Sequence, residues 1–161
     1  VSASSLIEAG SKARQSYRVQ VPPRLSITAP QPEARAELLP DESQVQFAPQ
    51  LWSIAANGQE GATIQFATEQ SFHHLGNDAI RRDASLRVSI LNQSHESIWE
   101  VTQAQATTSY VLGQEAATVQ VRSHRPGSAV LGVTVTFLQG DTPSTPPGDY
   151  VTTVVGTLTA N

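Results

Sequence analysis

The sequence contains no cysteine and no methionine, although it is 161 residues long. Without cysteine the chain can form no disulfide, no thiolate metal site and no cysteine nucleophile. Because methionine is missing even at position 1, we expect that a leader was removed, by a signal peptidase or by truncation. The length suffices for one domain with a core that needs no covalent cross-links.

Charge and long apolar runs are also scarce. Charged residues make up 15% of the chain, against roughly 25% in average soluble domains. The net charge is −4, and one lysine, Lys12, accompanies nine arginines. No basic stripe indicates nucleic-acid binding, and no apolar run approaches the ~20 residues that a membrane span needs. The neutral polar composition is typical of exported proteins and predicts a secreted or cell-surface location, with the periplasm as an alternative.

The strongest pattern lies near the C-terminus. In residues 129–138 the apolar side chains of Leu131, Val133 and Val135 alternate with glycine and threonine. This period of two is the mark of a half-buried strand. Valine and threonine also dominate residues 149–160, and their branched side chains favour strands. We predict two long antiparallel strands, joined by the proline-rich residues 139–148.

Short alternating runs fill much of the remaining chain. The spacing predicts an all-β fold, a two-sheet antiparallel β-sandwich of immunoglobulin-like type, over residues 17–161. Residues 1–16 are expected to form a flexible or short helical N-terminal arm. Asn57-Gly58 predicts a turn that joins two partner strands. Residues 72–83 are expected to be a polar loop. The expected strands are residues 25–27, 45–47, 51–54, 62–68, 86–90, 98–102, 110–112 and 118–121.

Residues 17–21, just before Pro22-Pro23, form an alternating run of their own. Tyr17, Val19 and Val21 alternate with arginine and glutamine. The run is either the first strand of the chain's own sandwich, which we favour, or a strand that adds to a neighbour's sheet edge.

A nine-residue sequence occurs twice. Residues 58–66 read GQEGATIQF and residues 113–121 read GQEAATVQV, and a tryptophan precedes each copy, Trp52 and Trp99. We interpret the repeat as the same strand–turn–strand unit in both halves, with each tryptophan in the core, because tryptophan buries a large area. The alternative is a pair of equivalent ligand sites.

Residues His73, His74 and Asp78 are the best candidates for ligand chemistry, because imidazole and carboxylate groups bind divalent metals. Adjacent histidines on an extended chain point to opposite sides, however, and no third histidine is near. We therefore predict neither a metal site nor a cofactor. No nucleophile elbow, phosphate-binding loop or dinucleotide motif occurs, so we predict that the protein is not an enzyme. A hydrolase site in residues 72–83 is a third hypothesis.

The ending PPGDYVTTVVGTLTA places a proline–glycine turn and a tyrosine before an alternating valine–threonine strand. It resembles the last strand of bacterial exported β-sandwich subunits, the pilin-like and spore-coat-protein-U-like group. This resemblance implies an exported immunoglobulin-like domain that works by assembly or adhesion. The residues that carry it are Gly148, Asp149, Tyr150, Val151, Thr153 and Val155.

The resulting hypothesis is an exported, non-catalytic structural or adhesive surface module. Its partner would be another protein or a second copy, bound through sheet edges. The alternative is a module that binds carbohydrate or another ligand, with a possible glycan stacked on Trp52, Trp99 or Tyr110. His73, His74 and Asp78 complete the set of candidate ligand-binding residues.

Overall fold

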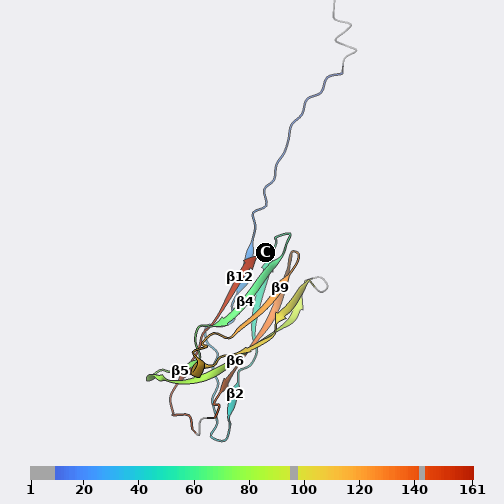
Figure 1. Cartoon of the computed structure of the whole chain (residues 1–161). Helices are drawn as coiled ribbons and strands as arrows, with labels where there is room; N and C mark the ends of the chain where they lie inside the picture. The colour runs from blue at the N-terminus through green and yellow to red at the C-terminus, as the bar shows by residue number, and fades with distance from the viewer. Residues whose placement is uncertain (1–9, 95–97, 142–143) are drawn as a thin grey trace, which may run out of the picture.

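The structure, a computed structural model, describes residues 10–94, 98–141 and 144–161. These residues form two antiparallel β-sheets, one of them strongly curled (Figure 1). The prediction of an all-β, sandwich-like fold is therefore confirmed. Residues 1–9 of the expected N-terminal arm lie outside the described residues.

The larger sheet has eight strands, in the order β1-β3-β10-β6-β5-β11, with β2 paired to β10 and β8 paired to β6. Its central pair is β10 and β6, which stay in register from Val133 opposite Val88 to Leu138 opposite Asp83. The strands are β1 (Leu25–Thr28), β2 (Gln44–Gln46), β3 (Gln50–Ala56), β5 (Phe72–His74), β6 (Asn77–Gln93), β8 (Gln105–Thr107), β10 (Gly127–Leu138) and β11 (Tyr150–Val151).

The smaller sheet has four strands, in the order β12-β4-β9-β7. A 3-10 helix, η1 (Tyr110–Leu112), precedes β9 and is the one helical element of the described residues. The strands are β4 (Ala62–Thr68), β7 (Trp99–Gln103), β9 (Thr118–Ser123) and β12 (Val154–Ala160).

Two hydrophobic clusters lie inside the fold. The main cluster fills the space between the sheets with side chains from β3, β4, β6, β7, β9 and β10. Gly156 on β12 brings this strand close to the core, because a Cβ there would lie 3.0–3.1 Å from Ile27, Phe66 and Trp52. A second, smaller cluster is centred on Phe72, Ala84 and Phe137 and occupies the end of the molecule near β2 and β5.

The two C-terminal strands exist, but the prediction that they pair with each other is wrong. β10 lies in the larger sheet between β3 and β6, whereas β12 lies in the smaller sheet beside β4. The chain after β10 first returns to the larger sheet, where β11 pairs with β5. The change from the larger to the smaller sheet lies between β11 and β12, at Thr152 and Thr153.

The turn at Asn57 likewise joins different sheets. β3 pairs with β1 and β10, and β4 pairs with β12 and β9, so the expected hairpin of β3 and β4 does not form. Both strands bury apolar residues on one face, and period-two patterning fixes that face without fixing the partner.

Two local predictions are also wrong. Residues 72–83 are not a loop but a hairpin of β5 and the start of β6, with Phe72 opposite Arg82. Residues 110–112 are the 3-10 helix η1 rather than a strand. Asp83 explains this turn, because its Oδ1 accepts hydrogen bonds from the Thr108 hydroxyl at 2.8 Å and the Tyr110 backbone N–H at 2.9 Å.

The repeated nine-residue sequence forms a single antiparallel pair. β4 and β9 carry the ends of the two copies, and Gln65 of the first faces Gln120 of the second. Ile64 faces Val121, and Phe66 faces Val119, so the two copies are related by a local two-fold axis through the glutamine pair. The repeat therefore builds the middle of the smaller sheet.

Candidate functional site

The N-terminal residues leave the body of the protein as an extended arm, defined here as residues 10–24 (Figure 1). The arm has no regular secondary structure, and its apolar side chains Tyr17, Val19 and Val21 are 84%, 86% and 71% exposed. The chain's own sandwich therefore begins at β1, and the favoured reading of residues 17–21 as its first strand does not hold. An exposed extended segment with alternating apolar side chains can add as a strand to the edge of another sheet.

Asn57 anchors the base of the arm. Its side chain accepts a hydrogen bond from the Arg24 backbone N–H and donates one to the Pro22 carbonyl at 3.0 Å. The Asn57 backbone N–H also donates to the Arg24 carbonyl at 3.2 Å. These contacts fix the arm beside the C-terminal end of β12, and from there it points away from the body (Figure 1).

A groove of about 610 Å³ lies near β2, β5 and β11. One wall is a segment without secondary structure, residues 31–38, here called the strap, and the other wall is residues 145–151. Both lie toward the end of the molecule opposite the arm (Figure 1). The volume is within the range of about 300–1,000 Å³ that is typical of binding sites.

Aromatic rings form the floor of the groove. Phe137 meets Phe72 edge-on at 5.0 Å and Tyr150 edge-on at 5.4 Å between ring centroids, and Phe47 stacks on Phe72 at 6.1 Å. Leu38 of the strap packs against this cluster and is half-buried. The floor is therefore apolar, and its ring pairs adopt the stacked and edge-to-face arrangements that aromatic side chains prefer.

Both walls have backbone groups without a partner. The backbone of residues 31–38 makes no hydrogen bond with any other described residue. On the opposite wall β11 ends the larger sheet and pairs with β5 on one side. An extended chain laid in the groove would find backbone donors and acceptors on both sides.

Arg82 and Tyr150 hold the loop that forms the second wall. Arg82 is 6% exposed, and its guanidinium donates to the Ser144 carbonyl at 2.9 Å and to the Thr145 hydroxyl at 3.4 Å. The Tyr150 hydroxyl donates to the Pro146 carbonyl at 2.8 Å. Burial raises the pKa of Tyr150, and the charge of Arg82 opposes this rise. The hydroxyl thus remains a donor, as the contact requires.

His74 fixes the same loop. Its Nδ1 accepts a hydrogen bond from the Gly76 backbone N–H at 2.9 Å, so its Nε2 carries the proton and donates to the Pro147 carbonyl at 2.9 Å. The ring also meets Tyr150 edge-on at 5.1 Å. Since both ring nitrogens are engaged, His74 serves as a structural contact between the β5 hairpin and the second wall.

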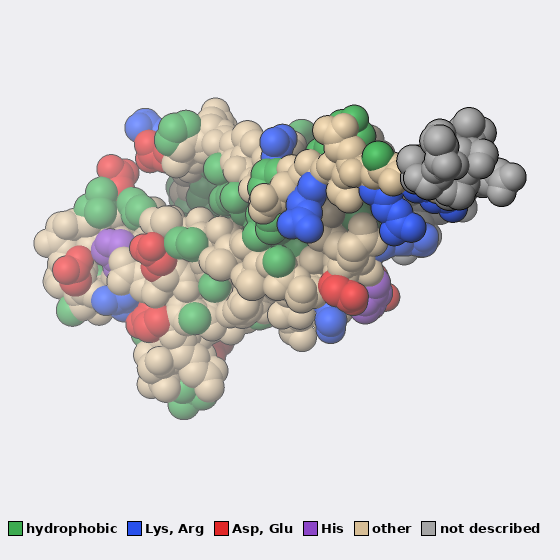
Figure 2. Space-filling view, turned by 90° about the horizontal axis from the view of Figure 1, so that it is seen from above, with side chains coloured by type: hydrophobic (Ala, Val, Ile, Leu, Met, Phe, Trp, Pro, Cys, Tyr) green, Lys and Arg blue, Asp and Glu red, His purple; other side chains and the backbone are tan. Residues whose placement is uncertain are grey.

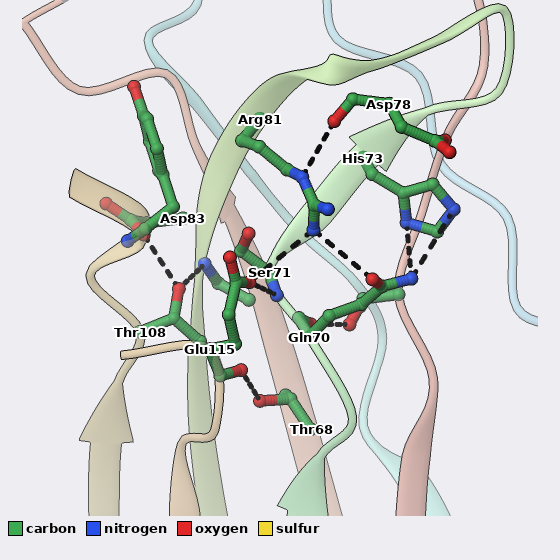
Figure 3. Close-up of polar contacts among 12 residues, drawn as sticks. Thr68, Gln70, Ser71, His73, Asp78, Arg81, Asp83, Thr108 and Glu115 are labelled. Atoms are coloured by element: carbon green, nitrogen blue, oxygen red, sulfur yellow. Dashed lines mark hydrogen bonds and ion pairs between the residues drawn. The ribbon is translucent and has the colours of Figure 1, made fainter. Parts of the chain in front are cut away.

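His73 points the other way, as predicted for adjacent histidines on an extended chain, and belongs to a polar cluster on the hairpin (Figure 3). The Gln70 side-chain amide nitrogen lies 2.8 Å from His73 Nδ1, and Arg81 donates to the side-chain Oε1 of Gln70 at 3.2 Å. Arg81 also lies 3.6 Å from the Glu115 carboxylate, and it donates from Nε to the Asp78 backbone carbonyl at 2.8 Å. Among the described residues, no group of three histidine, aspartate or glutamate side chains could hold a metal ion.

The same cluster includes a buried serine. Ser71 is 0% exposed. Glu115 accepts a hydrogen bond from the Ser71 backbone N–H at 2.6 Å. Hydrogen bonding to Ser71 is the main cause that lowers the pKa of Glu115, with smaller contributions from Arg81 and His73, while partial burial opposes them. The cluster therefore joins β5 and β6 to the turn before β9.

The three aromatic residues predicted as stacking platforms come from three different elements. Trp99 on β7 is 2% exposed and belongs to the main core. Trp52 on β3 is half-buried and meets Phe66 edge-on at 5.1 Å. Tyr110 begins η1 and is half-buried. Both tryptophans thus pack in or against the core, as expected if the repeat is a structural unit rather than a pair of ligand sites.

Sequence reasoning missed the groove itself. Its rings, Phe47, Phe72, Phe137 and Tyr150, are far apart in the chain and meet only through the pairing of β2, β10, β6, β5 and β11. One signal was available: the strap is a long stretch between prolines that is neither a regular strand nor a short turn.

The comparisons with known proteins leave the family open. No protein-family model matches the chain, and no curated protein matches it. In the part of the chain that the structure describes, no helix is long and apolar enough to cross a membrane.

Proposed function

We propose that this protein is an exported, non-catalytic structural subunit of a surface assembly, and that copies join when the extended arm of one lies in the groove of the next. The observation that carries the proposal is the exposure of Tyr17, Val19 and Val21, which are 71–86% accessible and lie on one side of an extended chain. Alternating apolar residues of this kind bind by adding a strand to a sheet edge.

The groove has the features that such a strand needs. Its aromatic floor can contact the apolar side chains of an entering chain. Unpaired backbone groups on the strap and on β11 can form hydrogen bonds with the backbone of that chain. A strand between these walls gains hydrogen bonds from its backbone and buries alternate side chains. Burial of one tyrosine and two valines contributes about 1.5–3 kcal/mol for each side chain.

The positions of arm and groove determine the type of assembly. The arm is anchored at Asn57 beside the end of β12 and points outward, and the groove lies toward the other end (Figure 1). The surfaces that meet are therefore different on the two partners, so the contact is head-to-tail. Contacts of this kind produce open chains unless the rotation between copies closes a ring.

Light scattering over a concentration series tests the proposal. The parent chain should grow in apparent mass with concentration. Val19→Asp places a charge on the apolar side of the arm and should keep the protein monomeric. Gln20→Asp adds the same charge one residue away on the opposite side and should leave most of the association intact.

A parent chain that stays monomeric at every concentration would contradict the proposal. So would association of Val19→Asp equal to that of the parent. Circular dichroism is the control for folding, and both variants should match the parent because the arm lies outside the body.

A further inference from the structure

We propose that two glutamates on the strap, Glu33 and Glu37, bind two arginines on the arm of the neighbouring copy, Arg14 and Arg18, and so set the register of the arm in the groove. This inference rests on the proposed function, since it assigns the charged contacts of the same junction. It adds a determinant of specificity that apolar burial alone does not supply.

The arm carries charge of one sign. Residues 10–24 contain Lys12, Arg14, Arg18 and Arg24 and no acidic residue, which amounts to four of the ten basic residues of the chain. In an extended chain Lys12, Arg14 and Arg18 share the side opposite Tyr17, Val19 and Val21. When the apolar side enters the groove, the basic side therefore faces out along its mouth.

The strap and the residues after it carry the opposite charge. Residues 31–42 contain Glu33, Glu37, Asp41 and Glu42 with one base, Arg35, a net charge of −3. Glu33 and Glu37 line the groove and are exposed, whereas the residue after each of them, Ala34 and Leu38, also lines the groove and is half-buried. On the face seen in Figure 2, basic side chains gather toward one end and most acidic side chains toward the other.

The spacing of the charges matches. Glu33 and Glu37 are four residues apart, as are Arg14 and Arg18, and Arg35 on the strap would face Ser16 on the arm, which is small and neutral. If the arm lies alongside the strap and runs in the same direction, Arg14 lies beside Glu33 and Arg18 lies beside Glu37. A shift of two residues would instead place an arginine beside Arg35, and like charges in facing positions are destabilising.

The strap glutamates are available for this contact. Glu33 has one ion pair, with Arg35 at 3.4 Å, and the two side chains are 63% and 84% exposed. Exposed pairs of this kind contribute little, so the pair can open for the arm. Glu37 makes no ion pair with any described residue.

The test is a charge exchange in the full-length chain, read by light scattering and sedimentation. Glu33→Arg with Glu37→Arg should weaken association about tenfold, since two attractions become two repulsions. Arg14→Glu with Arg18→Glu should weaken it similarly. All four substitutions in one chain should restore association to near the parent value. The matched control is Glu60→Arg with Glu69→Arg, which makes the same change in net charge at exposed residues outside the groove.

The outcomes separate this inference from the proposed function. If Val19→Asp blocks association and neither charge reversal changes it more than the control does, the charge contacts are wrong and the arm-in-groove assembly stands. If both reversals weaken association and the fourfold variant does not recover, the pairing is also wrong. If Val19→Asp has no effect, the proposed function itself fails. Recovery in the fourfold variant alone supports the inference.

Discussion

The backbone N–H of Ser71 donates a hydrogen bond of 2.6 Å to the carboxylate of Glu115, 44 positions away in the chain. Glu115 belongs to the second copy of the repeated sequence, and its counterpart in the first copy is Glu60. Glu60 is exposed, and its side chain makes no ion pair with a described residue. The two copies thus share a fold but differ in this contact, which ties the β5 hairpin near the groove to the smaller sheet.

Glu115 should make stability depend on pH in the acid range. Its folded pKa lies below the ordinary value of 4.5, because Ser71 and Arg81 favour the charged form. The contribution of Glu115 to the free energy of unfolding is therefore complete above pH 4.5 and decreases as the pH falls through the folded pKa. Glu115→Gln should lower the free energy of unfolding by about 1 kcal/mol at pH 7. A hydrogen bond to a buried charged group contributes more than this, and the partial exposure of Glu115 reduces the effect. Urea unfolding at pH 7 and pH 3 measures the difference, which should shrink at pH 3. Glu60→Gln is the control; an equal effect of both variants at pH 7 would contradict the assignment.

Gly61 and Gly113 provide a matched pair of backbone tests. Both have a φ of +75°, but a Cβ at Gly61 would lie 2.5 Å from the Ser123 carbonyl oxygen, whereas a Cβ at Gly113 would meet nothing within 4 Å. Gly113→Ala should lower the free energy of unfolding by about 1 kcal/mol, because alanine disfavours the left-handed conformation. Gly61→Ala should cost about 3 kcal/mol or more, since overpacking is added. Thermal unfolding of the two variants checks the order, and equal losses would show that β9 can move away from Gly61.

The two tryptophans should report different environments. In the Trp52→Phe variant the remaining Trp99 is 2% exposed, so its fluorescence should be blue-shifted and shielded from acrylamide. In the Trp99→Phe variant the half-buried Trp52 should be quenched more strongly. Strong quenching of Trp99, or a change in its emission when oligosaccharides are added, would instead favour the carbohydrate-binding alternative.

The sequence predicts the strands better than their partners. β10 and β4 follow from strict alternation, because burial on one face requires it. The pairings of β3, β4, β10 and β12 depend on which sheet each strand joins, and the local pattern carries no information on that choice. The hairpin of β5 and β6 was missed because most of its residues are only partly buried or exposed, so polar residues occupy both of its faces.

The candidate site was predictable only in part. The alternation of Tyr17, Val19 and Val21 was visible, but only the structure distinguishes a strand of the chain's own sandwich from an exposed arm. The groove depends on aromatic residues brought together by four strand pairings, which no window of sequence contains. The histidines stood out in the sequence, yet both of them have structural partners.

Disulfide trapping between copies tests the arm-in-groove assembly most directly, and the absence of native cysteine makes the experiment clean. In the proposed register, Val19 of the arm lies beside Leu38 of the strap. Mixing full-length Val19→Cys and Leu38→Cys chains under mild oxidation should give a covalent dimer of one chain of each kind, because a disulfide forms only when the two Cα atoms come within about 7 Å. Val111→Cys, at a position that is 78% exposed on η1, replaces Val19→Cys in the control mixture and should give little product. Equal yields from the two mixtures, or no mixed dimer at all, would contradict the assembly proposed here.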